Sequence, residues 1–172
     1  LGATAREIIV LEFSSAVMAL ILSGKVGSNI ASEIGTMRIT EQIDALDVMG
    51  VNSANYLILP KITAMVLFMP ILVIFSIACG LIGAGLVAYF TGNPSIDTYI
   101  YGIQAFFDPG NIFYAIKKSF VFAFLIASIP SFCGYYVKGG ALQVGRASTQ
   151  AVVTTSIMVL LSDVILTKLL LA

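Results

Sequence analysis

The sequence predicts an all-α integral membrane protein with about four transmembrane helices. Hydrophobic residues make up 59% of the 172 residues and charged residues only 10%, whereas an ordinary soluble domain carries about 25% charged residues. Four stretches are each apolar over the roughly 20 residues that a hydrocarbon core requires. Lys+Arg and Asp+Glu both number 9, so no net charge favours binding to nucleic acid.

The four predicted spans are residues 8–24, 62–90, 112–137 and 151–171. The second is long enough to tilt, and Pro70 within it predicts a kink. The sequence shows no internal repeat and no low-complexity tract, so residues 1–172 are interpreted as one transmembrane domain. No basic segment or cleavage site precedes the first span, and we expect an amino-terminal part of the protein to be missing from this sequence.

The positions of the basic residues predict the orientation of the spans. Lys25, Arg38 and Lys61 lie between the first and second spans, and Lys138 and Arg146 lie between the third and fourth. Both connections should therefore be cytoplasmic by the positive-inside rule. The connection at residues 91–110 has no Lys or Arg and suits the opposite side. Three residues run against this assignment, namely Lys117, Lys118 and Lys168.

The first cytoplasmic connection contains an amphipathic pattern at residues 32–50, which predicts a helix. Its apolar face consists of Ile39, Ile43, Leu46 and Met49. Its polar face carries Glu41, Asp44 and Asp47. Such a helix either rests on the bundle or the lipid interface, or docks into a cleft of a partner protein and transmits the partner's movement. The pattern alone leaves both interpretations open.

Three ionisable residues lie inside the predicted spans: Glu12, Lys118 and Asp163. A charge at the centre of a membrane helix costs about 2.5–3.5 kcal/mol on insertion scales, so each should face a partner or water. Counted at a rise of about 1.5 Å per residue from the cytoplasmic charges, all three fall in the non-cytoplasmic half. They form either a structural ion pair or a partly hydrated cluster beside a substrate path. Lys117 could take the place of Lys118, because adjacent helical residues face about 100° apart.

The sequence gives little support for enzyme chemistry. It contains no histidine, which removes the commonest general base and metal ligand. Cys79 and Cys133 lie singly in apolar runs, so they indicate neither a metal site nor a disulfide framework. No phosphate-binding loop of the G-x-x-x-x-G-K-[ST] type is present. We expect no catalytic residues, metal or cofactor here, and any ATP hydrolysis would have to come from another polypeptide.

The segment from Gly24 to Leu46 carries three motifs in uninterrupted order: G-x-x-G-S, A-x-E-I-G-T-M-R and T-E-Q-I-D-A-L. This segment resembles the MlaE permease family, and its length makes the resemblance specific. The similarity continues through Lys118-Ser119, Arg146-Ala147 and residues 163–167. Members of the family usually have Glu-Leu-Gly-Pro where this chain has Glu12-Phe13-Ser14-Ser15, and usually Arg in place of Lys25.

The resemblance implies a non-catalytic permease subunit of an ABC transporter that moves phospholipids or related lipids between a bacterial inner membrane and the outer envelope. The implied partners are a second permease copy, a cytoplasmic ATPase subunit, a periplasmic MCE-domain protein and, in some systems, a STAS-domain protein. The matching positions for ATPase coupling are Glu33, Arg38, Glu41, Gln42, Asp44 and Asp47. The matching intramembrane charges are Glu12, Lys118 and Asp163.

Two other functions are compatible with the residues alone. A secondary transporter or ion pathway would use Glu12 and Asp163 to carry protons or cations, and it would be driven by an ion gradient rather than by ATP. Inverted repeats with broken helices would favour this function, and the sequence contains none that we detect. A membrane scaffold without transport activity would use residues 32–50 only to recruit a partner.

Overall fold

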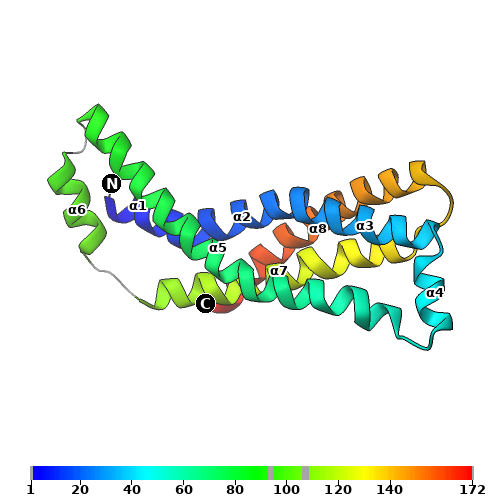
Figure 1. Cartoon of the computed structure of the whole chain (residues 1–172). Coiled ribbons are helices and arrows are strands. Elements are labelled where there is room, and N and C mark those ends of the chain that lie inside the picture. The colour runs from blue at the N-terminus through cyan, green and yellow to red at the C-terminus, as the bar shows by residue number, and fades with distance from the viewer. Residues whose placement is uncertain (1, 93–94, 106–108, 172) are drawn as a thin grey trace.

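The computed structural model describes residues 2–92, 95–105 and 109–171 (Figure 1). These residues form helices and no strand. The prediction of four spans is confirmed, because four helical stretches are long and apolar enough to cross a membrane: Ala3–Ile39, Ser53–Thr91, Gly110–Tyr135 and Ala141–Leu169. Several helices extend past the predicted apolar stretches, since hydropathy marks the part that suits lipid whereas backbone hydrogen bonding continues beyond it.

The first span is one long helical path with two π-helical turns. It consists of α1 (Gly2–Ile8), η1 (Ile9–Phe13), α2 (Ser14–Leu22), η2 (Ser23–Gly27) and α3 (Ser28–Ile39). A π-helical turn accommodates an extra residue and is frequent at functional sites. The turn η1 contains Glu12, so the local widening of the helix coincides with the intramembrane carboxylate.

Residues 32–50, predicted as one helix, are divided by a turn at Thr40 and Glu41 into the end of α3 and the short helix α4 (Gln42–Val48). Glu41 has a φ of 60°, a left-handed conformation that interrupts helical hydrogen bonding. The turn brings Ile43, which is fully buried, into a cluster with Ile30 and Ile34. The apolar face of the segment therefore packs against the bundle, which explains why the helix does not run straight on.

The second span, α5 (Ser53–Thr91), begins where the side chain of Asn52 accepts a hydrogen bond from the Asn55 amide at 3.1 Å. It ends at Gly92, whose φ of 65° closes the helix in the left-handed conformation. Pro70 lies near its middle, and α5 changes direction along its length (Figure 1). A proline removes a backbone donor and clashes with the preceding turn, so the predicted kink has its expected cause.

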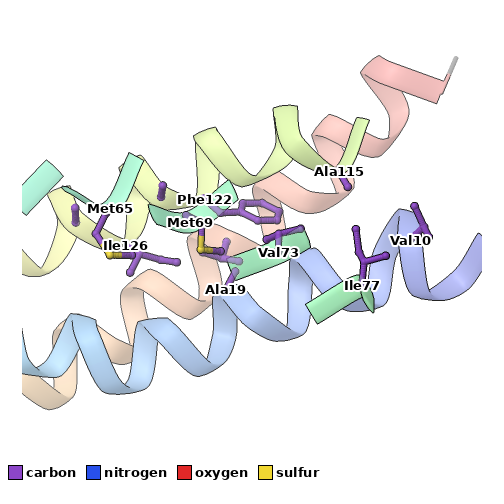
Figure 2. Close-up of a cluster of buried hydrophobic side chains, with 12 residues drawn as sticks. Val10, Ala19, Met65, Met69, Val73, Ile77, Ala115, Phe122 and Ile126 are labelled. Carbon is purple, nitrogen blue, oxygen red and sulfur yellow. The ribbon is translucent and has the colours of Figure 1, made fainter. Parts of the chain in front are cut away.

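The third span, α7 (Gly110–Tyr135), is the most buried of the four. Phe122 and Ile126 on one face of α7 meet Met69 and Val73 of α5 and Ala19 of α2 in the main apolar core (Figure 2). The fourth span, α8 (Ala141–Leu171), packs against α7, α3 and α2. The remaining faces of α5 and α8 are apolar and exposed, as expected for helices that face lipid or another subunit.

The two ends of the bundle differ. One end, called the α4 end here, carries α4 and the connection between α7 and α8 (Figure 1). The other, called the α6 end, carries the start of α1 and the helix α6 (Ile96–Gln104) (Figure 1). Residues 91–110 are predicted only as a connection, and α6 within them was not predicted, because its nine residues are too few for a strong periodic signal.

Arg6 attaches α6 to the start of the first span. Its side chain is 4% exposed and donates hydrogen bonds from Nη1 to the backbone oxygens of Ile103 at 2.7 Å and Ala105 at 2.8 Å. The last carbonyls of a helix have no partner within the helix, so a buried guanidinium both satisfies them and complements the helix dipole. From the other side, the Tyr99 hydroxyl donates to the Leu81 carbonyl of α5 at 2.8 Å.

We expect Arg6→Gln to loosen α6 without unfolding the bundle. Hydrogen bonds that involve a charged group are worth about 1.5–3 kcal/mol each, so amide hydrogen exchange in α6 should accelerate on the order of tenfold or more. Exchange in α7 should stay at the wild-type rate and serves as the internal control. Equal exchange of α6 amides in the variant and the wild type would show that Arg6 does not hold the helix.

Candidate functional site

Glu12, Lys118 and Asp163 come together inside the bundle, from η1, α7 and α8 respectively, and are called the charge cluster here. Lys118 Nζ lies 3.0 Å and 2.9 Å from the two carboxylate oxygens of Glu12. It also lies 2.8 Å from Asp163 Oδ1. One ammonium group therefore neutralises parts of two carboxylates on different helices, as charges in a low-dielectric interior require.

Two hydroxyl groups complete the surroundings of Glu12. Tyr114 donates a hydrogen bond to Glu12 Oε1 at 3.3 Å, and Thr167 donates to the same oxygen at 3.1 Å. Tyr114 also places its ring 4.8 Å from Lys118 Nζ, a cation–π distance. Asp163 is less well satisfied, because its buried Oδ1 accepts no well-aligned hydrogen bond from the described residues despite the short distance to Lys118.

The three side chains differ in exposure. Lys118 is fully buried, Asp163 is 16% exposed and Glu12 is 40% exposed. The cluster is thus closed on the side of α7 and open on the side of η1. With two carboxylates and one ammonium, it carries one more acidic group than basic groups. An exposed carboxylate in a membrane bundle requires water, a polar ligand or another protein surface beside it.

The sequence left open which of two adjacent lysines faces inward, and the structure selects Lys118, because Lys117 is exposed. Tyr114 and Thr167 also belong to the site and were not predicted from the sequence. A signal was available for both: Tyr114 precedes Lys118 by four residues, and Thr167 follows Asp163 by four. Residues at this spacing lie on the same helix face, one turn apart.

The six predicted coupling residues lie at the α4 end, around the turn between α3 and α4. Glu41, Asp44 and Asp47 are exposed and form what is called the acidic corner here. Gln42 is also exposed, as the first residue of α4. Glu33 lies further back on α3, where its carboxylate pairs with Lys61 Nζ of α5 at 2.6 Å.

Several contacts connect the acidic corner to the ends of three spans, α3, α5 and α7. Arg38 at the end of α3 pairs with Asp44 of α4 at 3.0 Å and lies 5.5 Å from the ring centre of Tyr135 at the end of α7. The amide of Ser53, the first residue of α5, donates to Asp47 Oδ1 at 3.4 Å. The Ser53 and Tyr135 hydroxyl groups lie 2.8 Å apart. A displacement of α4 would therefore act on α3, α5 and α7 together.

An apolar groove of about 290 Å³ lies beside the acidic corner, between α4 and the start of α5. Its apolar lining includes Met37, Leu46, Met49, Tyr56 and Leu57. Met49 and Tyr56 are 69% and 63% exposed. The α4 end thus combines exposed carboxylates with an unfilled apolar groove, the combination of a polar rim and an apolar centre that protein interfaces have.

Four apolar spans, three of which meet at the charge cluster, define a multi-pass, all-α membrane protein. The chain belongs to the MlaE permease family, because the family described as Permease MlaE matches residues 1–169. The predicted family is therefore confirmed.

Relatives from three groups of organisms agree with this membership. A probable ABC transporter permease protein of Rickettsia bellii is 39% identical over 158 residues, which cover 92% of this chain and 61% of the relative. A probable ABC transporter permease protein of Synechocystis is 37% identical over 161 residues, covering 92% and 60%. The chloroplastic protein TRIGALACTOSYLDIACYLGLYCEROL 1 of Arabidopsis thaliana is 31% identical over 157 residues, covering 91% and 45%. The chain thus spans about three fifths of the length of the bacterial relatives.

Proposed function

We propose that this chain is part of the permease subunit of an ABC transporter that moves phospholipids or related lipids between a bacterial inner membrane and the outer envelope. Membership of the MlaE permease family and the names of the relatives support the transporter class. The permease performs no bond chemistry in this proposal. A separate ATPase subunit supplies the energy, and lipid moves through a cavity between two permease copies.

The attachment of the acidic corner to α3, α5 and α7 is the observation on which the coupling step rests. An ATPase that grips α4 would pull on three of the four spans at once, through Arg38, Asp47 and the buried Ile43. A rigid helix transmits such a movement better than a loose connection does. Exposed carboxylates beside the apolar groove would let basic and apolar side chains of the ATPase bind the same corner.

The charge cluster has a second role in this proposal. It joins η1, α7 and α8 in the half of the membrane away from the α4 end, and the exposed side of Glu12 faces the surroundings of the bundle. We propose that this side borders the hydrated part of the lipid path, where the cluster rearranges as the helices separate. An MCE-domain protein would receive lipid at the α6 end, and a STAS-domain protein would bind on the ATPase side in some systems.

The geometry of the cluster favours this function over ion-coupled transport. A carrier site for a cation needs carboxylates that are free to accept it. Here Lys118 Nζ occupies the position between the two carboxylates, 2.9 Å from Glu12 Oε2 and 2.8 Å from Asp163 Oδ1. A carried cation would have to displace a lysine that is fully buried and held by Coulomb attraction on both sides.

The coupling step is tested by reversing two charges of the acidic corner. We expect Glu41→Lys/Asp44→Lys to lower co-purification of the ATPase subunit and lipid-dependent ATP hydrolysis on the order of tenfold or more, because like charges at a rim oppose a basic partner surface. Asp97→Lys is the control for ATPase co-purification, since Asp97 is an exposed acid of α6 at the opposite end from the acidic corner. Undiminished ATPase binding and hydrolysis in the double variant would refute the coupling assignment.

A further inference from the structure

Two adjoining cavities lie at the α4 end, where the chain leaves α7 and enters α8. The first is a polar cavity of about 220 Å³. The polar side chains that line it are Tyr136, Lys138, Gln143, Arg146 and Gln150. They come from the end of α7, the connection and the first turns of α8. The positive-inside rule explains why basic residues occur here, but not why they surround one cavity together with two amides and a phenol.

Lys138 and Arg146, the two cations of this cavity, have no anionic partner in the part of the chain that the structure describes. Neither Lys138 nor Arg146 takes part in any of the ion pairs or side-chain hydrogen bonds formed among residues 2–92, 95–105 and 109–171. By contrast, Arg38, Lys61 and Lys118 each pair with a carboxylate. Of the described Asp and Glu residues, none lines the cavity. Two unpaired cations with neutral hydrogen-bonding groups around them suit an anion with several acceptor oxygens, such as a phosphate group.

The second is a shallow, open apolar groove of about 620 Å³, lined by exposed residues of α8 alone. It shares Arg146 and Gln150 with the polar cavity, so the two are continuous. From Leu142 to Val153 it follows α8 over 12 residues, or about 16 Å at the helical rise. Gly145 lies on the groove, and no atom lies within 4 Å of the position that a Cβ would occupy there. The groove therefore has free space for a linear apolar group.

The depth of the two cavities matches the boundary of a membrane. Arg146 precedes Asp163 of the charge cluster by 17 residues, or about 25 Å along α8. A hydrocarbon core is about 30 Å thick. Because the charge cluster lies in the half of the membrane away from the α4 end, Arg146 lies near the headgroups of the leaflet at the α4 end. The polar cavity then lies at the level of lipid phosphates, and the groove extends from it toward the acyl chains.

We propose that these cavities bind one anionic phospholipid from the leaflet at the α4 end, with its phosphate between Lys138 and Arg146 and an acyl chain in the groove along α8. Basic pockets between transmembrane helices recognise anionic headgroups by this chemistry. A zwitterionic lipid is disfavoured, since the cavity offers no carboxylate to its ammonium group. The proposal requires only a membrane-embedded chain, and it stands whether or not the protein carries lipid across the membrane.

The charge requirement is tested with the purified full-length protein in nanodiscs of phosphatidylcholine with or without phosphatidylglycerol. Lipid retained after transfer to detergent is quantified by native mass spectrometry. We expect wild-type protein to retain phosphatidylglycerol, and Lys138→Gln/Arg146→Gln to lower its affinity on the order of tenfold. Lys117→Gln/Lys168→Gln is the matched control, because it removes two exposed cations from α7 and α8 toward the opposite end. Equal retention by both double variants would overturn the proposal.

The groove is tested without any change of charge. Gly145→Leu fills free space along α8 and should lower phosphatidylglycerol retention severalfold, whereas Gly83→Leu, at another open glycine on α5, should not. Three results would overturn the proposal: equal retention of phosphatidylcholine, full displacement of lipid by inorganic phosphate, or cross-linking of two copies through Leu142→Cys that persists with phosphatidylglycerol present. The last would show that a second copy covers the groove.

Discussion

Replacing Lys118 by methionine is expected to cause the largest loss of stability of any single substitution considered for this protein. The variant leaves the Glu12 and Asp163 carboxylates without their shared ammonium partner inside the bundle. Removing one member of a buried ion pair costs about 3–5 kcal/mol, because the remaining charge stays desolvated. Glu12 is 40% exposed, so the lower part of that range is expected. Thermal unfolding followed by size-exclusion chromatography in mild detergent measures the change.

Two further variants test whether the lost ion pairs cause the loss of stability in Lys118→Met. Lys117→Met removes an adjacent lysine that is exposed, and it should leave the unfolding midpoint close to that of the wild type. Glu12→Gln/Lys118→Met/Asp163→Asn removes all three charges, so it should recover most of the lost stability, since replacing a complete buried ion pair by neutral groups is often nearly neutral. A wild-type midpoint for Lys118→Met alone would show that the cluster contributes little to folding.

The triple variant also separates a structural role of the cluster from a role in transport. If the cluster only holds η1, α7 and α8 together, the triple variant should regain both stability and lipid-dependent ATP hydrolysis. If the exposed side of Glu12 borders the lipid path, stability should return while transport stays impaired. Recovery of both properties would therefore remove the charge cluster from the proposed lipid path and leave the coupling proposal intact.

The four spans could be predicted because the information lies in local composition. An apolar run of sufficient length specifies a membrane helix almost irrespective of its neighbours. The similar depth of Glu12, Lys118 and Asp163 could also be predicted, because the helical rise fixes the distance of each charge from the basic residues at the cytoplasmic ends of the spans. The sequence does not fix the rotation of each helix about its axis, so only the structure shows that Lys118, and not Lys117, faces the interior of the bundle.

Features that depend on tertiary contacts could not be predicted from the sequence. The turn at Glu41 arises because Ile43 finds a buried position against Ile30 and Ile34, which no local pattern specifies. Arg6 precedes the first apolar stretch, and nothing in its position in the sequence indicates burial. It is buried because the carbonyls at the end of α6 lie beside it. The π-helical turns also carry no composition signal, since they differ from an α-helix only in which carbonyl each amide selects.

The second large effect is expected at Gly134, where α7 crosses α3. A Cβ at this position would lie 2.6 Å from the Ala31 backbone oxygen and 3.1 Å from Ile34 Cβ. The nearest obstacle is backbone, so Gly134→Ala must move one helix away from the other. Overpacking of this kind costs about 1–3 kcal/mol. In an exposed part of a helix, the same change would stabilise by up to about 1 kcal/mol.

Gly83→Ala on α5 should change stability in the opposite direction, because no described atom lies within 4 Å of the position that its Cβ would occupy. The unfolding midpoint in mixed micelles should therefore be lower than that of the wild type for Gly134→Ala, and equal or higher for Gly83→Ala.

Apolar burial drives little helix association in lipid, where close approach at small residues contributes most of the attraction. Because the α3–α7 crossing lies between the acidic corner and the charge cluster, Gly134→Ala should also weaken lipid-dependent ATP hydrolysis. Stabilisation by both glycine variants would show that helix propensity, and not the α3–α7 contact, controls stability at Gly134.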